Sequence, residues 1–173
     1  MILLVLAGSK KLVDPAPTVG ALRSAGWPSA GPLVRLLGAV EMGVAGWFLV
    51  AGGPVPAILG ALLYAGFAVF VGRALVRDVP ISSCGCLGSR DTPPSVSHAV
   101  VNLFAVGVLT AGAIIPVAPL GGLVGQGMDV VVPQTIFIGA VPFLLYGILT
   151  VLPLVGKRAV RASDPLPMPG RRA

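Results

Sequence analysis

The feature that most constrains the fold is a series of long apolar stretches. Crossing the hydrocarbon core of a bilayer, about 30 Å thick, takes roughly 20 helical residues. Four stretches reach that length, at about 33–52, 56–76, 97–120 and 130–155. Only 10% of the residues are charged and the mean hydropathy is +0.96, which excludes an ordinary water-soluble domain. The sequence therefore predicts an all-α fold, a polytopic transmembrane helix bundle with four long spans in the lipid bilayer.

The opening stretch 2–8 is equally apolar but reaches only about 10 Å as a helix before Lys10 and Lys11. We interpret it as a truncated first helix, which forms residues 1–32 together with a cytoplasmic loop. The transmembrane bundle covers 33–156. The tail 157–173 is basic and rich in proline, so it is predicted to extend beyond the bundle.

The positions of the basic residues predict the topology. The connections 52–55 and 121–129 contain none of the 12 basic residues. By the positive-inside rule, the three groups that hold these residues are cytoplasmic, and so is the C-terminus. They are scattered rather than clustered on one helix face, so nucleic acid is not an expected partner. The groups are Lys10, Lys11, Arg23 and Arg35; Arg73, Arg77 and Arg90; and Lys157, Arg158, Arg161, Arg171 and Arg172.

The chain's two cysteines, Cys84 and Cys86, are separated by one glycine in the connection 77–96. A disulfide between them closes a small, strained ring, and strained exposed disulfides are the labile or catalytic ones. Arg77 and Arg90 favour the reactive thiolate form. Cysteine is also common as a small buried hydrophobe, but both lie outside the long spans. The pattern favours a redox pair, and as an enzyme the chain would be a thiol-disulfide oxidoreductase.

Glu41 lies about 12 Å along the first long span, close to mid-membrane, where an ionisable side chain needs a partner. Arg35 is off the spacings that make neighbours on one helix. The expected partner is therefore on another segment, with Lys10, Lys11 or Asn102 as candidates. A glutamate that holds helices together and one that handles protons both remain open.

His98 begins the third long span just after the cysteine connection, where it either exchanges protons with a thiol or marks the membrane interface. Two sulfurs and one imidazole fall short of a four-ligand metal site, so no metal is predicted. No flavin or quinone motif is visible and no cofactor is predicted, although a quinone site needs only a few polar groups. Four aromatic residues are too dispersed to predict a cofactor box: Trp27, Trp47, Tyr64 and Tyr146.

Several motifs are similar to those of one known family. Residues 7–15 follow its pattern A-G-x-x-K-L-x-D-P, and residues 84–88 follow C-G-C-F-G with leucine for phenylalanine. Glu41 and residues 93–95 match further positions. Over about 6–108 the chain therefore resembles the MauE family, methylamine-utilisation proteins grouped with DoxX-like four-helix membrane proteins. Asn102 also matches, but Val101 stands where the family has an arginine.

The resemblance implies a membrane redox protein that assists disulfide formation or maturation of an extracytoplasmic protein. In the family, the proposed substrate is the disulfide-rich small subunit of methylamine dehydrogenase, and a thioredoxin-like protein is the partner. Cys84 and Cys86 would be the redox pair, with Glu41, Asn102 and His98 in supporting roles. Two alternatives remain: a non-enzymatic membrane scaffold, and a metal or small-molecule permease that uses Glu41 and the cysteines as ligands.

Overall fold

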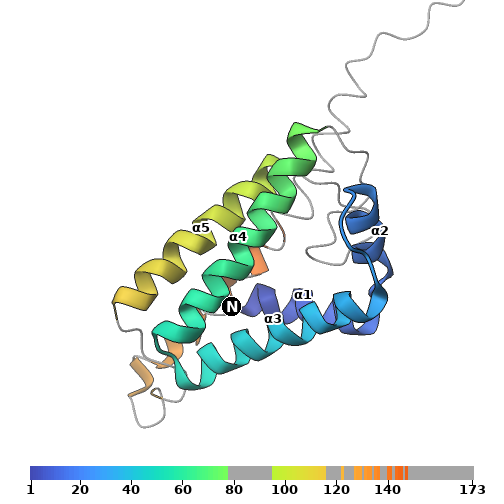
Figure 1. Ribbon diagram of the computed structural model, residues 1–173. Coiled ribbons are helices and arrows are strands. Elements are labelled where there is room, and N and C mark those ends of the chain that lie inside the picture. The colour runs from blue at the N-terminus through green and yellow to red at the C-terminus, as the bar shows by residue number, and fades with distance from the viewer. Residues whose placement is uncertain are drawn as a thin grey trace, which may run out of the picture.

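The computed structural model describes residues 1–77, residues 95–115 and scattered residues between 122 and 147. In this part of the chain the secondary structure is helical, without strands. The five named helices are α1 (Ile2–Val13), α2 (Ala16–Ser24), α3 (Gly31–Ala51), α4 (Pro54–Val76) and α5 (Val96–Ile114). Figure 1 shows their arrangement. The predicted all-helical fold is confirmed.

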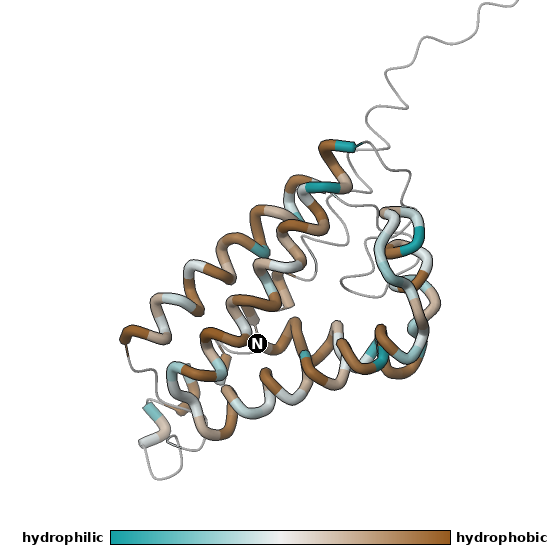
Figure 2. The backbone as a smooth tube through the Cα atoms, in the orientation of Figure 1, coloured by the Kyte–Doolittle hydropathy of each residue, from teal (hydrophilic) through white to brown (hydrophobic). Residues whose placement is uncertain are grey.

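Three of the helices, α3, α4 and α5, are long and apolar enough to cross a membrane. Apolar residues dominate all three along their length (Figure 2), and many of their large apolar side chains are exposed, as lipid contact requires. These helices correspond to the first three predicted spans. The fourth, at 130–155, lies largely outside the described residues.

Helix α5 ends at Ile114, and residues 116–120 of the third predicted span lie outside the described residues. Ile115 has extended backbone angles, with φ −100° and ψ 115°, and the next residue is Pro116. A proline disfavours helical angles in the residue before it. Hydropathy does not reveal this helix end, because the residues on both sides of it are apolar.

Two glycines make the tight turn between α3 and α4. Gly52 and Gly53 have φ values of 64° and 94°, which side chains with a Cβ rarely adopt. Pro54 then begins α4, where its missing N–H costs nothing. From this turn α3 and α4 diverge like the arms of a V (Figure 1).

The remaining helices pack on the two arms. Helix α1 lies along α3, and α5 lies along α4. Helix α2 lies near the open end of the V, where Ala21 packs against Phe70, Val71 and Ala74 of α4. It falls within the predicted loop of residues 1–32, so that loop contains a helix that the sequence did not predict. Pro17 lies in its first turn, where a missing N–H costs nothing, whereas Gly20 lowers its helix propensity, and the packing of Ala21 on α4 adds stability.

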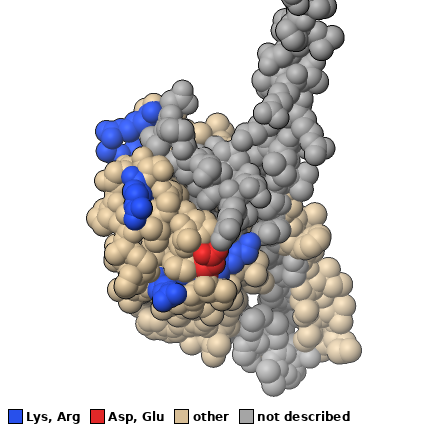
Figure 3. Space-filling model, turned by 90° about the vertical axis from the view of Figure 1, so that its right-hand side faces the viewer, with Lys and Arg blue, Asp and Glu red and all other residues tan. Residues whose placement is uncertain are grey.

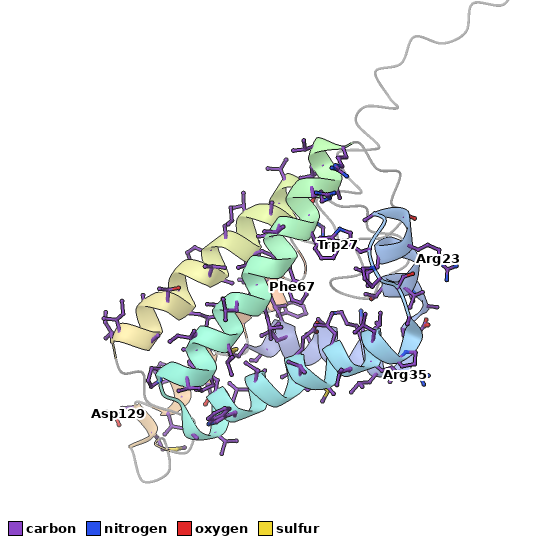
Figure 4. The ribbon with its side chains drawn as sticks, in the orientation of Figure 1. Arg23, Trp27, Arg35, Phe67 and Asp129 are labelled. Carbon is purple, nitrogen blue, oxygen red and sulfur yellow. The ribbon has the colours of Figure 1, made fainter. Side chains whose placement is uncertain are left out.

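Charge is distributed unevenly between the two ends of the V. Arg23 and Arg35 lie near its open end, whereas Asp129 lies near the α3–α4 turn (Figure 4). Arg73, in the last turn of α4, is also at the open end. Figure 3 shows lysine and arginine side chains as separate points on the described surface, with acidic side-chain atoms beside one of them. This polarity is the one that a membrane protein with a single basic face requires.

Candidate functional site

Helices α1 and α3 cross so closely that a Cβ added to a glycine of either helix would meet the backbone of the other. A Cβ built on Gly8 would lie 2.6 Å from the carbonyl oxygen of Gly38, and one built on Gly38 would lie 2.7 Å from that of Gly8. Gly8 also faces Glu41, and Gly38 faces Lys11, so the two helices run antiparallel. Glycine on both sides lets the backbones touch, as membrane helices often do where no hydrophobic effect drives association. We call this contact the α1–α3 seam.

A buried ion pair closes the seam. The Lys11 Nζ atom lies 2.8 Å from Glu41 Oε1 and donates a hydrogen bond of 2.9 Å to Oε2. The two side chains are 1% and 0% exposed. Within the described residues, Oε1 has no hydrogen-bond partner of good geometry. An ionised lysine and glutamate this deep must neutralise one another, because either charge alone would be strongly unfavourable.

This pair answers the question that Glu41 raises in the sequence. Of the three predicted candidate partners, Lys11 forms the ion pair. The geometry favours the interpretation in which Glu41 holds helices together, since its charge is already compensated. A role in proton handling stays a prediction.

Aromatic residues of α4 border the ion pair. The ring centroid of Phe67 lies 5.2 Å from Lys11 Nζ, within the range of a cation–π contact. Tyr64, which is 5% exposed, packs edge-on against Phe67 at 6.3 Å between centroids. The pair is therefore shared by three helices, and Phe67 separates it from the space between α3 and α4.

On the other side of Phe67 lies an apolar cleft of about 510 Å³ between the diverging arms of the V. We call it the α3–α4 cleft. Trp27, which precedes α3, lies at its outer end and packs edge-on against Phe70 at 5.8 Å. In Figure 4, Phe67 lies between the arms of the V and Trp27 lies farther toward its open end. Its remaining described lining is aliphatic: Leu22, Pro28, Leu33, Val34, Leu36, Leu37, Val40, Leu62, Leu63 and Gly66.

The first turn of α5 holds a small polar network. The Ser95 hydroxyl lies 2.7 Å from His98 Nδ1 and 2.7 Å from the Ser97 hydroxyl. His98 is only 3% exposed, so it is buried rather than placed at the surface. Asn102, one turn further on, is buried on the same face. The network fixes the orientation of the imidazole where the chain returns from the cysteine connection.

Cys84 and Cys86 lie outside the described residues. The described chain reaches their connection at Arg77, just after α4, and leaves it at Ser95, just before α5. The structure thus brings Lys11 and Glu41 together and places His98 and Asn102 on one face of α5. It does not test the roles predicted for these residues or for the cysteines.

The sequence analysis missed three features of this site: the seam glycines, Phe67 and the cleft. A signal for the seam was present. Gly8 and Lys11 are separated by three positions, and so are Gly38 and Glu41, which puts each glycine and its charged residue on one helix face. Two such faces of opposite charge are complementary. The cleft has no comparable signal, because it arises from the angle between α3 and α4.

Comparison with known proteins identifies the family. No curated protein and no solved structure gives a significant match. The family model described as methylamine utilisation protein MauE matches residues 1–118, a range that includes α1 to α5, the ion pair and both cysteines. This match covers well over half of the chain, and the chain belongs to the MauE family.

Proposed function

We propose that this chain is a membrane thiol-disulfide redox protein in which Cys84 and Cys86 alternate between dithiol and disulfide. It acts with a thioredoxin-like partner and assists disulfide formation in, or maturation of, an extracytoplasmic protein. The observation that carries the proposal is a pair of cysteines one residue apart, in the connection between two helices able to span the membrane. Membership of the MauE family supports it.

The exchange proceeds through a mixed disulfide. A thiolate of the partner attacks one sulfur of the Cys84–Cys86 disulfide and displaces the other as a thiolate, which takes up a proton. The partner's second thiolate then attacks the mixed disulfide and releases the remaining cysteine. The partner is oxidised by two electrons, and the Cys84–Cys86 pair is reduced by two electrons and gains two protons. Which sulfur is attacked first is left open.

Neighbouring residues support this chemistry in different ways. His98 is the one histidine of the chain and follows the cysteine connection, and its bond to Ser95 fixes its ring. We assign it the exchange of protons with the leaving thiol, because imidazole titrates near neutral pH. We assign Glu41 a structural role, in which its ion pair with Lys11 stabilises the α1–α3 seam. Asn102 supplies a buried polar group one helical turn after His98 on α5.

Topology follows from charge. The open end of the V carries Arg23, Arg35 and Arg73, and the α3–α4 turn carries no basic residue. We infer that the open end, the cysteine connection and the C-terminus face the cytoplasm. The protein substrate is extracytoplasmic. The two electrons released by each disulfide formed in it therefore have to cross the membrane to reach Cys84 and Cys86.

The ion pair counts against the permease alternative. In that hypothesis Glu41 is a metal ligand, but its carboxylate is held by Lys11 at 2.8 Å and 2.9 Å. A cation would have to displace a buried ammonium group and leave it uncompensated. The scaffold alternative makes a different prediction, since replacing both cysteines by serine would leave a scaffold functional.

Trapping of the mixed disulfide tests the proposal. The single variants Cys84→Ser and Cys86→Ser retain one thiol each, and a thioredoxin-like partner whose second cysteine is replaced by serine cannot release that thiol from a mixed disulfide. We expect at least one of them to accumulate a covalent complex with a thioredoxin-like protein that disappears on reduction. The double serine variant is the matched control. Absence of any reducible complex from both single variants, with partner and oxidant present, would refute the exchange.

A further inference from the structure

We propose that the α3–α4 cleft binds the ring of an isoprenoid quinone, which enters sideways from the bilayer. The inference rests on the proposed function. It adds to that function the two-electron acceptor that repeated disulfide formation requires.

Repeated disulfide formation needs an acceptor that takes up two electrons each time. Each oxidised partner leaves Cys84 and Cys86 as a dithiol, and forming their disulfide again releases two electrons and two protons. A quinone accepts both electrons and both protons and becomes a quinol. It is soluble in the bilayer, so it can collect electrons from a membrane protein whichever face the cysteines occupy.

The α3–α4 cleft has a suitable location and size for a quinone ring. Its lining comes from α3 and α4, two helices able to span the membrane, and from Leu22, Trp27 and Pro28 at the open end of the V. Its volume of about 510 Å³ falls in the range of pockets that hold small ligands, roughly 300–1,000 Å³. Leu36 and Leu62 are 61% and 63% exposed, so the cleft opens directly toward lipid.

The residues that line the cleft have a suitable chemistry for a quinone ring. Trp27, Phe67 and Phe70 provide aromatic faces against which a flat ring can pack. The indole N–H of Trp27 is the one polar side-chain group among the described lining residues, and it is a donor only. A quinone carbonyl is an acceptor, whereas an acyl chain offers none. The lining therefore favours a quinone ring over a lipid tail.

The cleft lies close in sequence to the connection that contains the cysteines. Phe70, in the wall of the cleft, lies about 9 Å by helical rise from the end of α4 at Val76. The cysteine connection begins directly after that end. Behind the cleft, the Lys11 ammonium holds Phe67 through its cation–π contact, which gives the site a fixed wall.

Tryptophan fluorescence tests the site, because the chain has two tryptophans. Trp27 lines the cleft, while Trp47 is 49% exposed on α3 and is not part of its lining. The variant Trp47→Phe therefore reports on the cleft, and Trp27→Phe reports on the background. The full chain in quinone-free lipid nanodiscs is titrated with a decyl-benzoquinone. We expect saturable quenching of Trp27 and only gradual, non-saturating quenching of Trp47.

Filling the cleft provides the matched comparison. A Cβ on Gly66, which lines the cleft, meets no atom within 4 Å, so Gly66→Leu can extend into the open space. Gly72 has equally free surroundings on the same helix but is not among the lining residues. In the Trp47→Phe background, Gly66→Leu should weaken quinone binding about tenfold or more, as expected for a crowded apolar pocket. Gly72→Leu should leave it unchanged.

Two outcomes would overturn the proposal. One is quenching of Trp27 that does not saturate and matches that of Trp47, which means simple partition of the quinone into lipid. The other is quenching of Trp27 by a brominated phospholipid that the quinone does not displace, which identifies a lipid groove. Saturable binding should persist in the Cys84→Ser, Cys86→Ser double variant. Binding with cysteines that never oxidise would refute the redox function alone, whereas cycling cysteines without saturable binding would refute the quinone site alone.

Discussion

Helix α3 packs in opposite ways on its two sides. Toward α1 it forms a seam so close that neither Gly8 nor Gly38 has room for a Cβ, with Lys11 and Glu41 fully buried beside it. Toward α4 it diverges from the turn at Gly52 and leaves an apolar cleft of about 510 Å³. One side is closely packed and contains charge, and the other is open and apolar.

The difference shows how a small bundle can combine a stable frame with space for a ligand. Close backbone contact and an ion pair give the seam directional interactions that do not depend on the hydrophobic effect, which is absent between helices in lipid. The cleft has no such interactions, so a lipid-soluble molecule can occupy it without displacing protein contacts. Phe67 touches both regions, because it lines the cleft and lies 5.2 Å from Lys11 Nζ.

Removing one charge should break the seam most severely. Glu41→Leu leaves a buried ammonium without its partner, and we expect it to destabilise the bundle by about 3–5 kcal/mol. The double variant Lys11→Met, Glu41→Leu removes both charges and should recover most of that loss. Thermal unfolding in detergent measures both. If the single and double variants were equally mild, the pair would not hold the seam.

Adding one carbon to the seam should have the next largest effect. In Gly38→Ala the new Cβ meets the Gly8 backbone carbonyl at 2.7 Å, so the helices must separate, at a cost of about 1–3 kcal/mol. Gly43→Ala on the same helix meets nothing within 4 Å and should change stability by less than about 0.5 kcal/mol. Unfolding midpoints of the two variants give the comparison. Equal midpoints would show that the seam is looser than described.

A polar contact outside the seam should matter less. Ser95→Ala removes the hydroxyl that bonds His98 Nδ1 at 2.7 Å, and we expect a loss of about 1 kcal/mol. Thr110→Val is the matched control on α5, since its exposed hydroxyl bonds only the Val106 carbonyl in the described contacts. Chemical unfolding resolves such a difference. A larger loss for Thr110→Val would contradict the assignment of His98 to a fixed network.

The smallest effect, with the opposite sign, belongs to the cleft. Gly66→Leu replaces a helical glycine by a good helix former where there is free space, so stability should rise by roughly 0.5–1 kcal/mol. The same kind of change that damages the seam at Gly38 should therefore be tolerated across the cleft. Destabilisation by Gly66→Leu would mean that the cleft is packed rather than open.

The sequence predicts those parts of the fold that depend on local properties. Apolar length locates α3, α4 and α5, and the Gly52 to Pro56 breakers locate the hairpin, because helix length and turn chemistry are encoded residue by residue. Lys11 was among the expected partners of Glu41 because a buried charge requires compensation.

Features that depend on tertiary contact could not be predicted in the same way. Helix α2 packs through Ala21 on Phe70 and Val71 of α4, a contact between segments far apart in the sequence. The cleft depends on the angle at which two apolar helices separate, and hydropathy is blind to that angle. The roles of Cys84 and Cys86 remain predictions from their spacing and their family.

The oxidation state and exposure of Cys84 and Cys86 decide whether this chain is a thiol-disulfide redox protein. A membrane-impermeant maleimide is applied to spheroplasts and to inside-out vesicles, each with and without prior reduction. The redox function and the charge-based topology predict labelling only in inside-out vesicles and only after reduction, which identifies a cytoplasm-facing disulfide. Labelling in spheroplasts would reverse the topology, and thiols that label without reduction and never become oxidised would contradict the redox function itself.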